Sequence, residues 1–124
     1  MISVIMLTFN RGQFVGNMIE DVLSQNYPDF EFIIVNNGSM DGTGELLTRY
    51  AKSDNRIKVL TLNTPQSIGM GRNFGLRNAK GEYVAFVDDD DRVEPDFLEF
   101  LISLLKENGA DISMCGATEG DGRT

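Results

Sequence analysis

The stretch "EFIIVNNGSMDGTGELLTRYAKS", residues 31–53, decides the fold. Its first part, residues 31–37, is an apolar and β-branched run that predicts a strand covered on both faces. After a turn that contains Gly38, residues 41–53 predict a helix with apolar side chains at helical spacing. These side chains are Leu46, Leu47, Tyr50 and Ala51. A buried strand that passes through a glycine turn into a helix indicates one half of a β-α-β unit.

The same alternation continues on both sides of this stretch. Further strands are predicted at residues 2–8, 56–62, 82–88 and 110–117. Further helices are predicted at residues 13–25, at 66–81 with Gly81 as a left-handed cap, and from Pro95 to just before Gly109. This order predicts a single α/β domain over residues 1–124, with a doubly wound, mostly parallel sheet.

The charge balance limits the kinds of partner. The chain has 11 Lys and Arg against 19 Asp and Glu, which gives a net charge of -8 and no basic stripe. A nucleic-acid partner is therefore not expected. The sequence has no histidine, so carboxylates are the available acid–base groups.

Cysteine content and hydropathy bear on the compartment. Cys115 is the single cysteine, so no intrachain disulfide can form, which fits a reducing compartment. Residues 1–11 have no basic segment before their apolar run and predict a strand, not a signal peptide. No apolar stretch is long enough for an integral membrane segment. We therefore expect cytoplasmic localisation.

Polar segments follow three of the predicted strands. They are Thr8–Arg11, Asn36–Ser39 and the run of four aspartates Asp88–Asp91. In doubly wound sheets, ligands bind outside the carboxyl ends of the strands. We therefore expect these three segments to meet at one edge of the sheet and to form the binding site.

The four aspartates repel one another unless a cation lies between them or water surrounds them. Because side chains alternate along a strand, Asp88 and Asp90 are expected on one side, with Cα atoms about 6.6 Å apart if the strand continues. Such a pair can share a hard divalent cation such as Mg²⁺, Mn²⁺ or Ca²⁺. Asp89 and Asp91 are then expected to face away, as solvated or helix-capping groups. The alternative is a solvated acidic turn without a ligand.

Two other side chains are candidates for ligand contacts. Asn37 carries a donor and an acceptor and can pair with a base edge, or it belongs to a plain turn in which Ser39 or Asp41 caps the next helix. Arg72 lies early in the predicted helix at residues 66–81 and can reach a diphosphate, or it is a surface arginine.

Five stretches in this order carry a family resemblance. They are "ISVIMLTFNR" (2–11), "VLSQNYPDFEFIIVNNGSMDGT" (22–43), "GMGRNFGLRNAKGEYVAFVDDDD" (69–91), "RVEPDFLE" (92–99) and the strand predicted after it at residues 110–117. Together they resemble the N-terminal, nucleotide-binding half of family 2 glycosyltransferases, which have the Rossmann-like GT-A fold. The resemblance covers nearly the whole chain.

The resemblance implies a role for each matching residue. Asp88 would lie by the ribose and the metal, and Asp90 would bind the metal, Mn²⁺ or Mg²⁺, directly. Asn37 takes the place of the family's base-contacting aspartate, so its bond to a uracil N3–H would be neutral and about half as strong. The implied nucleotide-binding residues are Thr8, Phe9, Asn10, Asn37, Ser39, Arg72 and Asp88.

The resemblance also implies a reaction: metal-dependent, inverting transfer of a sugar from a nucleoside-diphosphate sugar to a hydroxyl group of a glycan or lipid-linked acceptor. The family's catalytic base and acceptor pocket would lie beyond residue 124. We therefore expect a truncated donor-binding half that is inactive alone and self-associates through an exposed sheet edge. Missing regions could add peripheral attachment to the inner face of a membrane.

Two other functions are compatible with these residues. One is a non-catalytic nucleotide-binding module that keeps the fold. The other is a sugar nucleotidyltransferase, a class that usually has a glycine-rich, Arg-bearing loop after the first strand. The segment "TFNRGQF", residues 8–14, does not have this loop.

Overall fold

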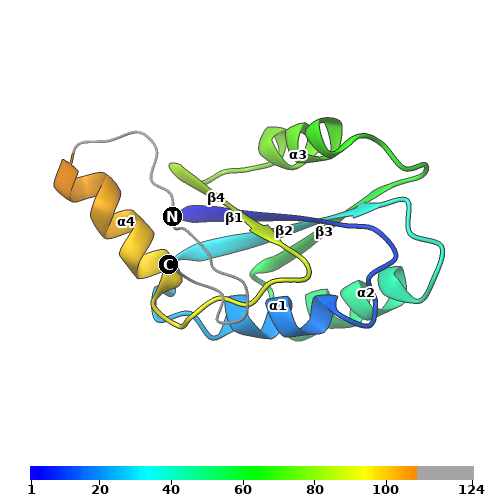
Figure 1. Cartoon of the computed structure of the whole chain (residues 1–124), viewed down its shortest axis with the longest axis horizontal. Coiled ribbons are helices and arrows are strands. Elements are labelled where there is room, and N and C mark those ends of the chain that lie inside the picture. The colour runs from blue at the N-terminus through cyan, green and yellow to red at the C-terminus, as the bar shows by residue number, and fades with distance from the viewer. Residues whose placement is uncertain (109–124) are drawn as a thin grey trace.

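The computed structural model describes residues 1–108, in which four strands alternate with four helices (Figure 1). The strands are β1 (Ile2–Thr8), β2 (Phe30–Asn37), β3 (Ile57–Leu62) and β4 (Tyr83–Asp88). The helices are α1 (Val15–Leu23), α2 (Thr43–Ser53), α3 (Ile68–Arg77) and α4 (Phe97–Asn108). The predicted alternation of strands and helices is confirmed. The predicted strand at residues 110–117 lies outside the described residues.

The four strands form one parallel sheet in the order β3-β2-β1-β4. Thr8 lies beside Asn36 of β2, and Leu7 lies beside Asp88 of β4. The carboxyl ends of the strands therefore meet at one edge, as predicted. The central strands β1 and β2 are buried along nearly their whole length, because helices cover both faces.

The helices pack on both faces of the sheet, as a doubly wound fold requires. Figure 1 shows α1 and α2 on one face and α3 on the other. The larger core contains alternate strand residues packed with α1, α2 and α4: Val4, Met6, Phe32, Ile34, Ala85, Val87, Met18, Ile19, Leu47, Leu98 and Ile102. The smaller core lies under α3 and contains Ile5, Ile33 and Val35 with Leu7, Leu60, Leu62, Phe74 and Ala79.

Two glycines bring α3 close to the sheet. Gly71 and Gly75 are both buried and lie four residues apart, so they share one face of the helix. A Cβ atom on Gly75 would lie 2.7 Å from Cγ2 of Ile5, which is too close for any real side chain. The small residues of α3 therefore serve close packing against β1.

The ends of all four helices differ from the predictions. Helix α1 covers Val15–Leu23 instead of residues 13–25, α2 begins at Thr43 instead of residue 41, and α4 begins at Phe97, two residues after Pro95. The prediction of Gly81 as a left-handed cap is wrong, because α3 ends at Arg77 and the one described glycine with positive φ is Gly38. Gly81 is small for another reason: a Cβ there would lie 2.7 Å from the backbone oxygen of Met1.

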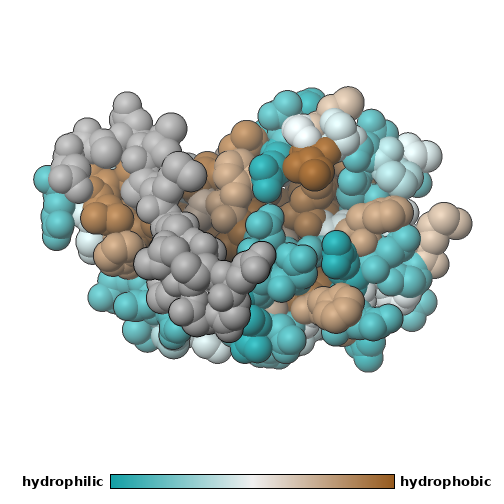
Figure 2. All heavy atoms as spheres, in the orientation of Figure 1, coloured by the Kyte–Doolittle hydropathy of each residue, from teal (hydrophilic) through white to brown (hydrophobic). Residues whose placement is uncertain are grey.

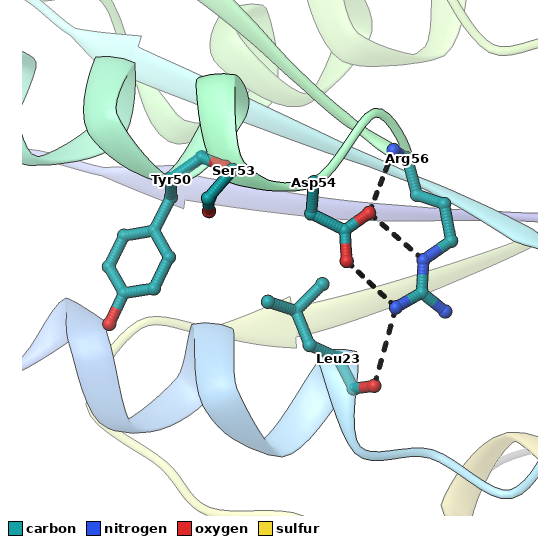
Figure 3. Close-up of polar contacts among 5 residues, drawn as sticks. All are labelled: Leu23, Tyr50, Ser53, Asp54 and Arg56. Carbon is teal, nitrogen blue, oxygen red and sulfur yellow. Dashed lines mark hydrogen bonds and ion pairs between the residues drawn. The ribbon is translucent and has the colours of Figure 1, made fainter.

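The turn from α2 to β3 contains an ion pair and is bound to the end of α1 by a hydrogen bond (Figure 3). The Nη2 of Arg56 lies 2.9 Å from Oδ2 of Asp54 and donates a longer bond of 3.5 Å to the backbone oxygen of Leu23. The same guanidinium lies over the Phe30 ring, 4.5 Å from its centroid. This cluster lies at the amino ends of β2 and β3, at the opposite edge of the sheet from the expected site.

Strand β4 is an edge strand of the described sheet and carries exposed apolar side chains. Val84 and Phe86 are 40% and 42% exposed, since α3 packs over β1 and β2 and leaves this face of β4 open. Figure 2 shows apolar surface gathered between α3 and α4. Within residues 1–108, no helix is both long and apolar enough to cross a membrane.

Candidate functional site

The loops after β1 and β2 are joined at the carboxyl edge of the sheet. The backbone N–H of Asn10 donates to Oγ of Ser39 over 3.0 Å, and the N–H of Met40 donates to Oδ1 of Asn10 over 2.8 Å. Asn10 adopts a positive φ of 51°, which asparagine tolerates better than most residues. The structure thus brings the predicted site residues Asn10 and Ser39 together.

Thr8 is almost fully buried at the end of β1, and its hydroxyl donates a hydrogen bond of 2.8 Å to Oδ2 of Asp89. Phe9, the next residue, is 45% exposed and presents its ring at the surface. Of this predicted pair, Phe9 is therefore the one that is open to a ligand. A nucleoside contact by Thr8 stays a prediction.

The expectation that Asp89 is a solvated group is wrong. Asp89 directly follows the last residue of β4 and is half-buried, with its carboxylate bonded to the buried Thr8 at the end of β1. Burial raises the pKa of Asp89 above its usual value, although the bond from Thr8 and the charge of Arg11 oppose this shift. Asp89 thus links the ends of β1 and β4.

The acidic turn, residues Asp88–Asp91, does not continue the strand. Strand β4 ends at Asp88, and the N–H of Asp91 donates to the backbone oxygen of Asp88 over 3.3 Å. The spacing expected for an extended strand therefore does not apply to Asp88 and Asp90. Both carboxylates are exposed, as a ligand-binding role requires.

The carboxylates of Asp88 and Asp90 each have an arginine beside them. Nη2 of Arg72 lies 3.6 Å from Oδ1 of Asp88, and Nη1 of Arg11 lies 4.0 Å from Oδ2 of Asp90. The Arg72 guanidinium also lies over the Phe86 ring, 5.3 Å from its centroid. Arg72 is thus at the sheet edge, as predicted. Arg11 was not singled out from the sequence, although it directly follows Asn10 in the polar segment after β1.

Asn37 is engaged with the loop that leads into α3. Its Nδ2 donates to the backbone oxygen of Gln66 over 2.9 Å, and its Oδ1 accepts from the N–H of Gln66 over 2.8 Å. Asn37 is also buried. The amide therefore stabilises this loop, and its contact with a base stays a prediction.

A polar hollow of about 470 Å³ opens beside α2 at the same edge. Its lining residues are Asn36, Ser39, Asp41, Gly44, Glu45, Thr48 and Thr61. The N-cap of α2 is Gly42, and not Ser39 or Asp41 as in the plain-turn alternative, but Asp41 does accept hydrogen bonds from the N–H and hydroxyl of Thr43. Ser39 therefore belongs both to this hollow and to the loop pair with Asn10.

The electrostatics of the acidic turn fit a divalent cation. Partial burial and the nearby carboxylates of Asp88 and Asp90 raise the pKa of Asp91, so the turn holds like charges that a cation would neutralise. Within residues 1–108, no three acidic or thiol side chains are grouped closely enough to hold a metal ion by themselves. One or two carboxylates with the oxygens of a bound diphosphate are, however, the usual environment of Mg²⁺.

Comparison with known proteins agrees with this geometry. Residues 3–124 match the sequence model of Glycosyl transferase family 2. The chain is 35% identical over 112 residues to the glycosyltransferase GlyG of Streptococcus pneumoniae serotype 4, covering 90% of this chain and 37% of GlyG. It is 36% identical over 116 residues to TuaG of Bacillus subtilis, described as a teichuronic acid biosynthesis glycosyltransferase, covering 94% of this chain and 46% of TuaG. The chain thus spans less than half the length of either relative.

Solved structures show the same fold. Residues 1–349 of TarS from S. aureus superpose with a TM-score of 0.87 at 29% identity, covering 99% of this chain and 37% of that one. TarS 1–349 in complex with UDP-GlcNAc gives a TM-score of 0.85. The mannosyltransferase PcManGT of Pyrobaculum calidifontis, at 23% identity and a TM-score of 0.81, shares the fold. From its sequence match and from the parallel sheet that carries its polar residues at one edge, the chain belongs to glycosyltransferase family 2.

Proposed function

We propose that the protein transfers a sugar from a nucleoside-diphosphate sugar to an acceptor hydroxyl, and that residues 1–124 hold the donor. The main support for this proposal is that two exposed carboxylates lie beside arginines at the sheet edge, Asp88 beside Arg72 and Asp90 beside Arg11. Such a site offers ligands for a cation and donors for a diphosphate within one small area. The UDP-GlcNAc complex of the related TarS supports a uridine nucleotide as the first ligand to test.

Different residues of the site contact different parts of the sugar nucleotide in this proposal. Phe9 offers an exposed ring to the nucleoside, and Asn10 with Ser39 fixes the loop that carries this ring. Arg72, steadied over Phe86, donates to diphosphate oxygens. Asp88 and Asp90 would hold Mn²⁺ or Mg²⁺, which when bound would act as a Lewis acid for the departing diphosphate.

The mechanism that we propose is inverting, with a carboxylate base that deprotonates the acceptor. The chain matches less than half of GlyG and TuaG, so we place this base and the acceptor site in the part of such proteins that residues 1–124 do not match. A positioned general base contributes about 10²–10⁴-fold in rate. The chain alone should therefore bind a donor and transfer no sugar.

Titration calorimetry with uridine diphosphate, with and without Mn²⁺, tests the donor site. Asp90→Asn should abolish the Mn²⁺-dependent part of binding, because a cation ligand and its charge are lost. Glu99→Gln removes an exposed carboxylate of α4 and is the matched control, which should bind as the parent does. Equal affinity in the parent with and without Mn²⁺ would contradict metal dependence. Preference for guanosine or thymidine diphosphate would identify a different base.

Two activity assays separate the remaining alternatives. Donor binding without transfer, in a protein that joins residues 1–124 to the second part that relatives such as GlyG and TuaG have, would favour a non-catalytic module. Release of pyrophosphate from a nucleoside triphosphate would favour a nucleotidyltransferase. The exposed Val84 and Phe86 on the edge strand β4 support the proposal of self-association, which light scattering tests. Cytoplasmic localisation and a glycan or lipid-linked acceptor also belong to this proposal.

A further inference from the structure

The segment that follows the acidic turn is bound to helix α1. In Figure 1 the chain leaves β4 at the carboxyl edge and runs back along α1 to α4. Oδ2 of Asp21 on α1 accepts hydrogen bonds from Nε of Arg92 over 2.7 Å and from the N–H of Val93 over 3.0 Å. Oδ1 of Asp21 accepts a third bond from Nη2 of Arg92, also over 3.0 Å.

The end of α1 continues this contact along the same segment. The side chain of Gln25 donates to the backbone oxygen of Glu94 over 2.7 Å and accepts from the N–H of Leu98 over 2.9 Å. The N–H of Asn26 donates to the backbone oxygen of Pro95 over 2.8 Å. Of these contacts, the one with Asp21 comes first along the segment, because its partner Arg92 directly follows Asp91.

The acidic turn is therefore held at both ends. At one end β4 is in register with β1, and Thr8 binds Asp89. At the other end Asp21 holds Arg92 and Val93. Asp89, Asp90 and Asp91 bridge these two anchors, and their carboxylates repel one another, so a turn released at one end would spread.

We propose that Asp21 is a positioning residue, which holds residues 89–91 in the arrangement that a divalent cation with a nucleoside diphosphate requires. This inference rests on the proposed function. Asp21 has only 14% of its side chain exposed, and its carboxylate is paired with Arg92, so we infer that it acts through the turn and not by contact with the donor. Residues that orient metal ligands typically change metal affinity about 10–100-fold when they are replaced.

The bonds that Asp21 makes show why the charge matters. Burial alone would raise the pKa of Asp21, but the hydrogen bonds from Arg92 and from the Val93 N–H outweigh it and lower the pKa below its usual value. Three donors converge on the two carboxylate oxygens, whereas an asparagine amide would offer an acceptor at only one of these two positions. In Asp21→Asn, an NH₂ group would face one of these donors and push the segment away.

The test is a Mn²⁺ titration in the presence of uridine diphosphate, read by the electron paramagnetic resonance signal of free Mn²⁺. Asp21→Asn should weaken Mn²⁺ binding about 10-fold. The matched control is Asp54→Asn, which removes an equally well-paired aspartate at the opposite edge of the sheet (Figure 3). It should lower the melting temperature as Asp21→Asn does, but leave Mn²⁺ affinity unchanged.

A second variant covers the case in which Asp21→Asn does not fold. Arg92→Gln removes the exposed partner, whose side chain is 65% exposed, and should weaken Mn²⁺ binding in the same direction. If folded Asp21→Asn or Arg92→Gln bound Mn²⁺ as tightly as the parent, the role of Asp21 would be refuted while the proposed function would stand. An equal loss of Mn²⁺ affinity in Asp54→Asn would refute that role in the same way. No Mn²⁺ binding by the parent would overturn the proposed function and the inference together.

Discussion

The hydroxyl of Thr8 binds the carboxylate of Asp89 over 2.8 Å and so joins two strand ends that lie 81 residues apart in the sequence. Thr8 is buried, and Asp89 is the one half-buried residue of the acidic turn, whose other three aspartates are exposed. The bond places the loop after β1 and the acidic turn side by side. The hydrogen bond between Thr8 and Asp89 thus connects the proposed nucleotide-binding loop after β1 with the proposed metal-binding turn after β4.

Thr8→Val should destabilise the protein by about 1 kcal/mol at pH 7, since a half-buried carboxylate loses its donor while the shape is kept. The bond from Thr8 lowers the pKa of Asp89, so its contribution is present when Asp89 is ionised and disappears as the pH falls and Asp89 becomes protonated. Urea unfolding at several pH values measures this.

Thr61→Val on β3, where the side chain is exposed, is the matched control and should change stability by less than about 0.5 kcal/mol. A Thr8→Val variant as stable as the parent at neutral pH would show that water replaces the hydroxyl.

Gly75→Ala should destabilise the protein by about 1–2 kcal/mol, because its Cβ would lie 2.7 Å from the buried Ile5 and α3 would have to move away from β1. Gly69→Ala in the same helix meets nothing within 4 Å. It should instead gain up to about 1 kcal/mol from helix propensity. Thermal unfolding of the two variants measures the difference, and a stabilising Gly75→Ala would contradict the close packing of α3.

Glu31→Gln should cost about 2 kcal/mol at pH 7, because charge-assisted bonds at a buried carboxylate are lost. Glu31 accepts hydrogen bonds from the hydroxyl of Ser3, from the N–H of Lys80 and from Nζ of Lys58. Burial would raise the pKa of Glu31, but these three donors outweigh it and lower the pKa below the usual 4.5.

A lowered carboxyl pKa contributes stability above the usual value of 4.5, and this stability is lost as the pH falls through the folded-state pKa. The stability difference between the parent and Glu31→Gln should therefore be largest at neutral pH and shrink in acid. Glu45→Gln, at an exposed position on α2, should show no such dependence. A difference that is constant with pH would mean that the bonds from Ser3, Lys80 and Lys58 do not favour the ionised form of Glu31.

Asn37→Asp should destabilise the protein by about 1–3 kcal/mol, because a carboxylate oxygen would face the backbone oxygen of Gln66 in place of the donating Nδ2. The family resemblance alone favours tighter uridine binding by this variant, since the aspartate is the family's own residue. With the amide engaged by Gln66, we expect no gain in affinity for uridine diphosphate.

Calorimetry and thermal unfolding together test this prediction, with Asn55→Asp at an exposed turn as the control. Tighter uridine diphosphate binding by Asn37→Asp at an unchanged melting temperature would show that residue 37 reads the base directly.

Local periodicity in the sequence was enough to determine the fold class. Residues 2–8 were predicted and observed as a strand with the same bounds. A short run of mostly apolar residues is typical of a central strand of a parallel sheet, because helices cover both faces of such a sheet. The order of strands and helices then places Thr8, Asn37 and Asp88 at one edge. Helix ends such as those of α1 and α3 were less predictable, because the first and last turns of a helix depend on packing against the rest of the protein more than on the spacing of apolar residues.

Only the tertiary structure decided how the site residues are used. The sequence shows four consecutive aspartates with nothing to distinguish them. In the structure Asp89 is half-buried and bonded to Thr8, while Asp88 and Asp90 are exposed beside Arg72 and Arg11. Likewise, nothing near Asp21 in the sequence indicates a bond to Arg92, which lies 71 residues away. Period and propensity describe neighbours along the chain, whereas these contacts form only when the sheet has brought distant loops within hydrogen-bonding distance.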